Sequence, residues 1–176
     1  MSDSVNQTLE RLKGEIASSI DDITEGELRF HSPGKWCIAE VLEHLYLTYT
    51  GTLKGFERMT AAGHPLATAP TLKQRLQAFI VVGLGYMPSG RDAPRVARPR
   101  GLAAEMVLAD IGRKVGEMDA MIARCEKEFG EGKLLDHPFL GPLSGHGWRK
   151  FHFVHGRHHL KQIRQLRKTY SPSLRT

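Results

Sequence analysis

Hydrophobic residues recur along most of this chain at steps of three and four, which is the repeat of an α-helix with one apolar face. The longest uninterrupted example lies between positions 102 and 129, where no proline breaks the pattern. The segments that show the repeat span positions 4–23, 36–61, 102–129 and 148–169. We therefore predict four long amphipathic helices.

A fifth, shorter helix is predicted between positions 71 and 82. Thr71 and Gln74 have the spacing of a capping box, in which each side chain satisfies a backbone amide at the start of a helix. The apolar residues that share one face of this segment are Leu72, Leu76, Phe79 and Ile80.

The remaining segments are predicted to be connections. Residues 24–35 and 131–147 are rich in polar residues, glycine and proline, and no segment is predicted to be a β-strand. Residues 83–101 contain four arginines and are predicted to form a long basic surface loop. The pattern thus predicts an all-α fold, an antiparallel four-helix bundle with an additional short helix and a long basic loop, in a single domain over residues 1–176.

Composition narrows the class of protein. The 176 residues are 40% hydrophobic and 25% charged, as in globular proteins. No stretch approaches the roughly 20 apolar residues of a membrane-spanning helix, and the first residues do not resemble a secretory signal, so a cytoplasmic location is expected. Cys37 and Cys125 are the only cysteines, and a disulfide between them is not expected. The net charge of +6 permits attraction to anions without requiring a nucleic-acid partner.

Candidate chemistry concentrates in the last predicted helix, where residues 148–162 hold four of the nine histidines. His155 and His159 are one turn apart on a helix, with Cβ atoms about 5–6 Å from each other, so both imidazoles can reach one divalent ion. The same spacing also occurs on solvated helix faces. Gln162 lies on the same stripe, whereas His152 and His158 lie about 60° to either side of it.

A third ligand would be needed, because catalytic zinc-type sites have three protein ligands and one open position. His44 is the best candidate, since it lies on an apolar-periodic segment and is expected to face the core. A histidine at such a position is more often a hydrogen-bonded core residue than a ligand, so the residues alone leave this alternative open.

Two segments of the sequence resemble the DinB-like superfamily of damage-inducible helical bundles. The first, which begins the second long helix, is Phe30-His-Ser-Pro-Gly-Lys-Trp-Cys-Ile-Ala-Glu-Val-Leu-Glu-His-Leu. The second combines His137-Pro-Phe-Leu-Gly-Pro-Leu-Ser-Gly-His-Gly-Trp with Phe151-His-Phe-Val-His-Gly-Arg-His-His-Leu-Lys-Gln-Ile in the last helix, and it is similar to a branch known only as a domain of unknown function.

The resemblance implies a bundle in which three histidines bind a divalent metal ion. By matching motifs, these are His44, His155 and His159, with His158 as the main rival for one position and His152 as a lesser one. Characterised relatives include thiol transferases that use low-molecular-weight thiols such as bacillithiol or mycothiol, and related enzymes isomerise or hydrolyse. This chain departs from the motif at Cys37, where the family often has serine.

The leading hypothesis is a divalent-metal-dependent enzyme of the thiol S-transferase or hydrolase type, with zinc, nickel or iron as the ion. Gln162 would orient a ligand or a bound water, and Glu40 is a candidate general base, although a solvent-facing carboxylate is the simpler interpretation. The alternative is a non-catalytic stress-response or binding protein with a structural or vestigial metal. The expected partner is a small molecule, such as a low-molecular-weight thiol. The sequence leaves a homodimer open. Nucleic acid is the least favoured partner, because the basic segments lack interleaved aromatic residues that could stack on bases.

Overall fold

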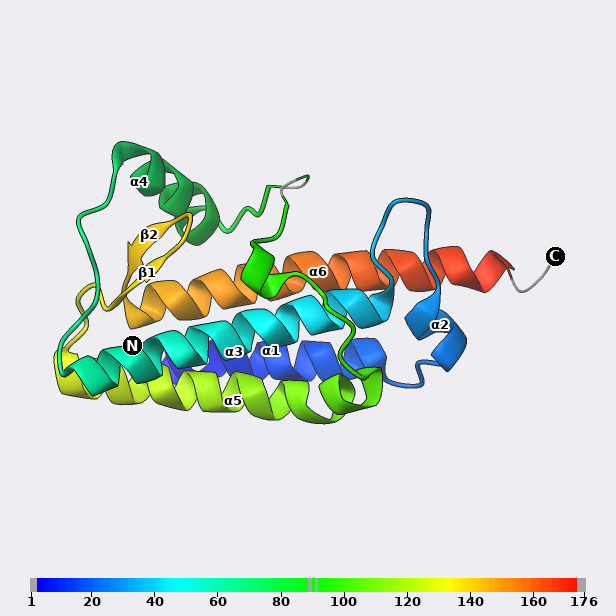
Figure 1. The fold of residues 1–176 in the computed structure, drawn as a ribbon, viewed down its shortest axis with the longest axis horizontal. Helices are drawn as coiled ribbons and strands as arrows, with labels where there is room; N and C mark the ends of the chain where they lie inside the picture. The colour runs from blue at the N-terminus through cyan, green and yellow to red at the C-terminus, as the bar shows by residue number, and fades with distance from the viewer. Residues whose placement is uncertain (1–2, 89, 91, 174–176) are drawn as a thin grey trace.

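Four long helices pack into a bundle in the computed structural model, which describes residues 3–88, 90 and 92–173 and the side chains of residues 7–88, 90 and 92–170. They are α1 (Asp3–Ile20), α3 (Ile38–Ala62), α5 (Ala104–Phe129) and α6 (Gly145–Ser173). Figure 1 shows that α1 and α6 run in one direction and α3 and α5 in the opposite one. The long connection between α3 and α5 therefore returns along the bundle before α5 begins. The predicted helical bundle is confirmed.

The apolar stripes predicted from the sequence form the core of this bundle. Leu12 of α1, Leu45 of α3, Met118 of α5 and Ile163 of α6 are completely buried, and they belong to one continuous hydrophobic cluster. Val5, at the start of the predicted first stripe, lies outside the residues whose side chains are described.

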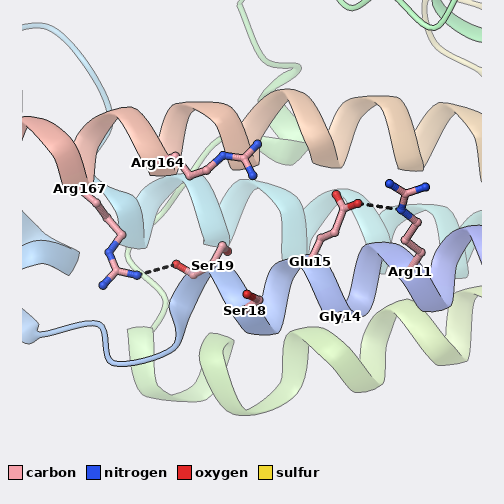
Figure 2. Close-up of a pocket in the computed structure, with 7 residues that line it drawn as sticks. All are labelled: Arg11, Gly14, Glu15, Ser18, Ser19, Arg164 and Arg167. Atoms are coloured by element: carbon pink, nitrogen blue, oxygen red, sulfur yellow. Dashed lines mark hydrogen bonds and ion pairs between the residues drawn. The ribbon is translucent and has the colours of Figure 1, made fainter.

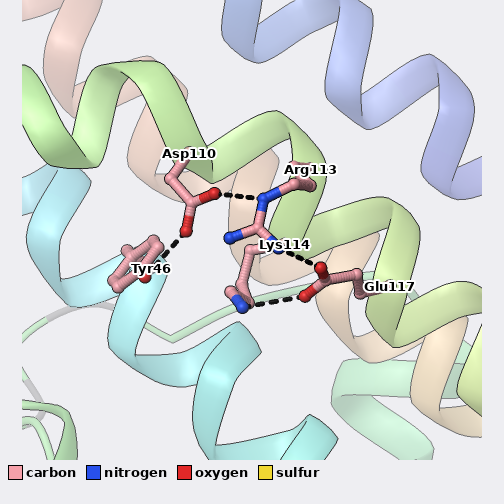
Figure 3. Close-up of polar contacts among 5 residues, drawn as sticks. All are labelled: Tyr46, Asp110, Arg113, Lys114 and Glu117. Carbon is pink, nitrogen blue, oxygen red and sulfur yellow. Dashed lines mark hydrogen bonds and ion pairs between the residues drawn. The ribbon is translucent and has the colours of Figure 1, made fainter.

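Polar contacts at the surface reinforce the packing of α3 against α5. The Tyr46 hydroxyl of α3 donates a hydrogen bond to the Asp110 carboxylate of α5 at 2.9 Å, as Figure 3 shows. Asp110 also accepts from Arg113, and Arg113 and Lys114 both pair with Glu117 one turn further along α5. Such exposed ion pairs each contribute little, about 0–1 kcal/mol, so the apolar core rather than this network holds the two helices together.

A short helix and a β-hairpin were not predicted. A short helix, α2 (Glu25–Arg29), lies in a segment interpreted as a connection, and Thr24 begins it with a capping box in which its hydroxyl accepts from the Glu27 amide at 3.2 Å. The prediction that the chain has no strand is wrong, because β1 (Leu135–His137) and β2 (Gly141–Leu143) form an antiparallel hairpin in which Leu135 faces Leu143.

The predicted short helix exists, but its apolar face is not buried. α4 (Leu72–Ala78) begins at the predicted Thr71–Gln74 capping box, and a π-helical turn, η1 (Phe79–Gly83), continues it. Leu72, Leu76 and Phe79 are 83%, 61% and 59% exposed. As Figure 1 shows, α4 stands beside the hairpin and away from the four long helices, so its apolar face has no helix of the bundle to cover it.

The basic loop is in contact with the bundle rather than free of it. Within it, a 3₁₀ turn, η2 (Arg95–Ala97), packs on α3, and Ala97 is buried. Among the described residues, no helix is long and apolar enough to span a membrane. Both cysteines are free thiols, and both are buried.

Candidate metal centre

Three imidazoles from the two helices that carry the histidine motifs meet inside the bundle. His44 extends from α3, while His155 and His159 extend from consecutive turns of α6. Their Nε2 atoms converge, with His155 Nε2 at 3.2 Å from His44 Nε2 and 3.1 Å from His159 Nε2. All three residues are at least nine-tenths buried. The predicted meeting of these histidines is confirmed, whereas their role as metal ligands stays a prediction.

Hydrogen bonds on the far side of two rings fix which nitrogen carries the proton. His44 Nδ1 lies 2.7 Å from the carbonyl oxygen of Ala97, and His159 Nδ1 lies 2.8 Å from the amide oxygen Oε1 of Gln162. Both oxygens can only accept, so each Nδ1 must donate its hydrogen. The Nε2 atoms of His44 and His159 therefore present unprotonated lone pairs toward His155.

Burial keeps all three rings neutral at pH 7. Desolvation lowers the pKa of His44, and the hydrogen bond to Ala97 opposes this effect only partly. Desolvation, together with the neighbouring His44, lowers the pKa of His159 to about 3. The pKa of His155 lies well below its usual range, because this ring is buried and adjoins the other two. Neutral imidazole is the form that binds metal ions.

The arrangement fits a single divalent ion. Three nitrogens at about 2.0–2.1 Å from a tetrahedral ion lie about 3.3–3.4 Å apart, close to the 3.1 and 3.2 Å separations of the Nε2 atoms. Without an ion, neutral His155 has one Nε2 proton and can donate it to only one of its two neighbours, so the Nε2 lone pair of the other neighbour is left without a donor. His155 Nδ1 also has no hydrogen-bond partner among the described residues. A cation would be bound by the Nε2 lone pairs of all three rings and would leave none of them without a partner.

Aromatic rings enclose two sides of the cluster. Phe151 stacks on His155 with ring centroids 5.3 Å apart, and Trp36 lies against His44 at the same centroid separation. These rings keep water from those sides of the imidazoles, which strengthens electrostatic interactions in the cluster.

Support of the cluster by the basic loop was not predicted from the sequence. The carbonyl oxygen of Ala97 orients His44. Further along the loop, the buried carboxylate of Glu43 holds the backbone in place. Glu43 accepts hydrogen bonds from the backbone amides of Arg100 at 2.8 Å and Gly101 at 3.1 Å. Glu43 directly precedes His44, so α3 contributes both the ligand candidate and the anchor of the loop that positions it.

The other candidates of the sequence analysis lie outside the cluster. His158 Nε2 is 3.1 Å from the Gln162 amide nitrogen, so Gln162 bridges His159 and the half-buried His158. His152 is completely buried, with its Nε2 3.1 Å from the Thr52 hydroxyl. The Glu40 carboxylate accepts a hydrogen bond from the Cys37 amide at 2.8 Å, at the start of α3. This contact occupies the carboxylate and does not favour a role for Glu40 as general base.

Two surface hollows lie on other parts of the described bundle. One hollow of about 480 Å³ lies between α1 and α6 and is lined by polar residues, including Arg11, Glu15 and Arg164 (Figure 2). A second, of about 450 Å³, lies between α3 and α5 and includes Leu53 and Glu117. Neither is lined by a residue of the cluster.

Comparison with known proteins identifies one family. The family described as a protein of unknown function, DUF1569, matches residues 7–166, and it is generally placed in the DinB/YfiT-like superfamily. No curated protein and no solved structure matches the chain.

Proposed function

Since the chain belongs to the DUF1569 family, whose function is unknown, we propose that it binds one divalent metal ion through His44, His155 and His159. The observation that carries this proposal is the convergence of three Nε2 atoms, two of which have their protons fixed on the opposite nitrogen. In a histidine cluster that binds no metal, each ring nitrogen would instead be expected to have a hydrogen-bond donor or acceptor of its own.

The ligand set suggests the chemistry of the site. Three neutral imidazoles leave a divalent ion its full charge, and such an ion acidifies a bound water or thiol toward neutral pH. The chain's own residues would hold the imidazole orientations through Ala97 and Gln162 and exclude water with Phe151 and Trp36. On this basis we propose a metal-dependent enzyme of the thiol S-transferase or hydrolase type, acting on a small molecule.

One observation favours the second candidate, a non-catalytic binding or stress-response protein with a structural metal. Glu40 was the carboxylate considered as general base, and it is bonded to the backbone at the start of α3. With Glu40 occupied in this way, an S-transferase or a hydrolase would depend on the ion alone to acidify the bound thiol or water.

Two measurements test the proposal in sequence. The metal content of protein purified without added metal is determined first, for the wild type and for His44→Ala and His155→Ala, with His64→Ala as a matched control because His64 is exposed and remote in sequence. Both cluster variants are expected to lose one equivalent of metal, and the control to retain it. Full occupancy in both cluster variants would refute the site.

The metal-loaded wild type is then assayed with low-molecular-weight thiols and electrophiles, and with hydrolysable esters and amides. Turnover that disappears in His44→Ala supports the enzyme. A protein that binds metal, gains thermal stability from it and turns over none of these substrates supports the structural alternative.

A further inference from the structure

A second group of metal-ligand side chains lies at the beginning of α3, outside the histidine cluster. His31, Cys37 and Glu40 each offer one donor atom, and these nitrogen, sulfur and oxygen atoms all lie within 4.8 Å of one another. We propose that they form a second, peripheral site for a thiophilic divalent cation such as Zn²⁺ or Co²⁺.

A tight turn brings the three residues together. Gly34 adopts a left-handed conformation (φ 68°), and the Lys35 amide donates to the Ser32 carbonyl oxygen at 3.0 Å, so the chain reverses between His31 and the start of the helix. His31 is thereby returned to the first turn of α3, where its Nδ1 lies 3.7 Å from the Glu40 carboxylate.

The donors match the cation class. Cysteine sulfur, histidine nitrogen and carboxylate oxygen are all zinc ligands, and sulfur selects thiophilic ions over Mg²⁺ and Ca²⁺. Around a tetrahedral Zn²⁺ such donors lie about 3.3–3.6 Å apart, so the group must contract slightly. His31 can make this adjustment because its side chain is 59% exposed, whereas the buried Cys37 is held at the N-cap of the helix.

The helix terminus affects the affinity of the site in two ways. The partial positive charge at the start of α3 favours a thiolate and a carboxylate there but opposes the cation itself. Burial also raises the pKa of the Cys37 thiol, so the cation must displace a proton in order to bind. The need to displace this proton lowers the affinity of the peripheral site for the cation near neutral pH.

Cobalt distinguishes the two sites, because only a sulfur ligand gives the near-ultraviolet thiolate-to-cobalt charge-transfer absorption. Full-length protein stripped of metal is titrated with Co²⁺. The absorption is expected to appear in the wild type and in His44→Ala, which shows that it does not depend on the histidine cluster.

Three variants assign the absorption. Cys37→Ser is expected to abolish it, and His31→Asn to raise the Co²⁺ concentration needed by at least tenfold. Cys125→Ser is the matched control, since Cys125 is buried in α5 with its sulfur 3.5 Å from the Thr60 hydroxyl, and it should retain the absorption. Circular dichroism verifies that each variant is folded. Absence of the absorption in the wild type, its survival in Cys37→Ser, or an unchanged titration of His31→Asn would overturn the proposal.

Discussion

The hydrogen bond between Gln162 and His159 provides a quantitative test of how the proposed metal centre is organised. The Gln162 amide oxygen holds the proton of His159 on Nδ1 at 2.8 Å and so keeps Nε2 directed at the cluster. Gln162→Leu removes this acceptor while keeping side-chain carbons out to the δ position at an exposed position of α6. His159 is then free to rotate and to change tautomer.

The expected loss can be estimated from similar contacts. Removing a group that orients a metal ligand costs about 10–100-fold in metal affinity. This corresponds to about 1.4–2.8 kcal/mol, in line with the roughly 1–3 kcal/mol for leaving a buried donor without its acceptor. Because Gln162 is exposed, water can partly replace its amide oxygen, and we expect a value near the lower end, about tenfold.

The assay is a competition titration of Zn²⁺ against a chelator of known affinity. Gln165→Leu, also exposed and on the same helix, is the matched control and should bind as the wild type does. Gln162→Glu retains an acceptor and should bind at least as tightly as the wild type. If Gln162→Leu binds Zn²⁺ within twofold of the wild type, the amide does not position His159 and this reasoning is wrong.

Three further predictions concern the stability of the bundle. Thr52→Val leaves Nε2 of the buried His152 without its hydroxyl partner and should lower the free energy of unfolding by about 1–3 kcal/mol in urea denaturation; a loss below half a kcal/mol would contradict it. Burial lowers the pKa of His152 to about 3, so at acidic pH the unfolded chain binds more protons than the folded one. The free energy of unfolding of the metal-free protein should therefore be highest above about pH 6.5, the ordinary pKa of histidine, and should decrease as the pH falls below it. Equal urea midpoints at pH 7.5 and pH 5 would refute this. Gly156→Ala should lower the free energy of unfolding by about 1–3 kcal/mol, because the new Cβ would lie 2.6 Å from the Leu12 side chain. Gly116→Ala has open space around its Cβ and should raise the free energy of unfolding by about 0.5–1 kcal/mol. Thermal melts in which both variants shift in the same direction would exclude the close packing of α1 against α6.

The long helices could be predicted from the sequence because each buries one continuous stripe. The stripe between positions 102 and 129 predicted α5 (Ala104–Phe129) to within two residues. The hairpin was missed because strands of three residues are too short to show alternation, and Pro142 lies within one of them. The short helix α2 begins at a capping box of Thr24 and Glu27, but its 5 residues are too few to show a helical repeat.

The three histidines of the cluster were predictable, whereas their surroundings were not. Two of them share a helix at a spacing of four, His44 lies on an apolar-periodic segment, and the resemblance to a known family supported all three. The carbonyl oxygen of Ala97 reaches His44 across 53 positions of the sequence, and any residue type provides such a carbonyl, so nothing in the sequence marks it. The exposed apolar face of α4 was likewise unpredictable, because periodicity shows that a face exists but not what covers it.

The central claim is that one divalent ion binds between His44, His155 and His159, and anomalous diffraction from crystals of the Zn²⁺-loaded protein tests it most directly. The account predicts an anomalous peak about 2.0–2.1 Å from all three Nε2 atoms. Density that shows three imidazoles bonded only to one another, with no peak between them, would contradict it.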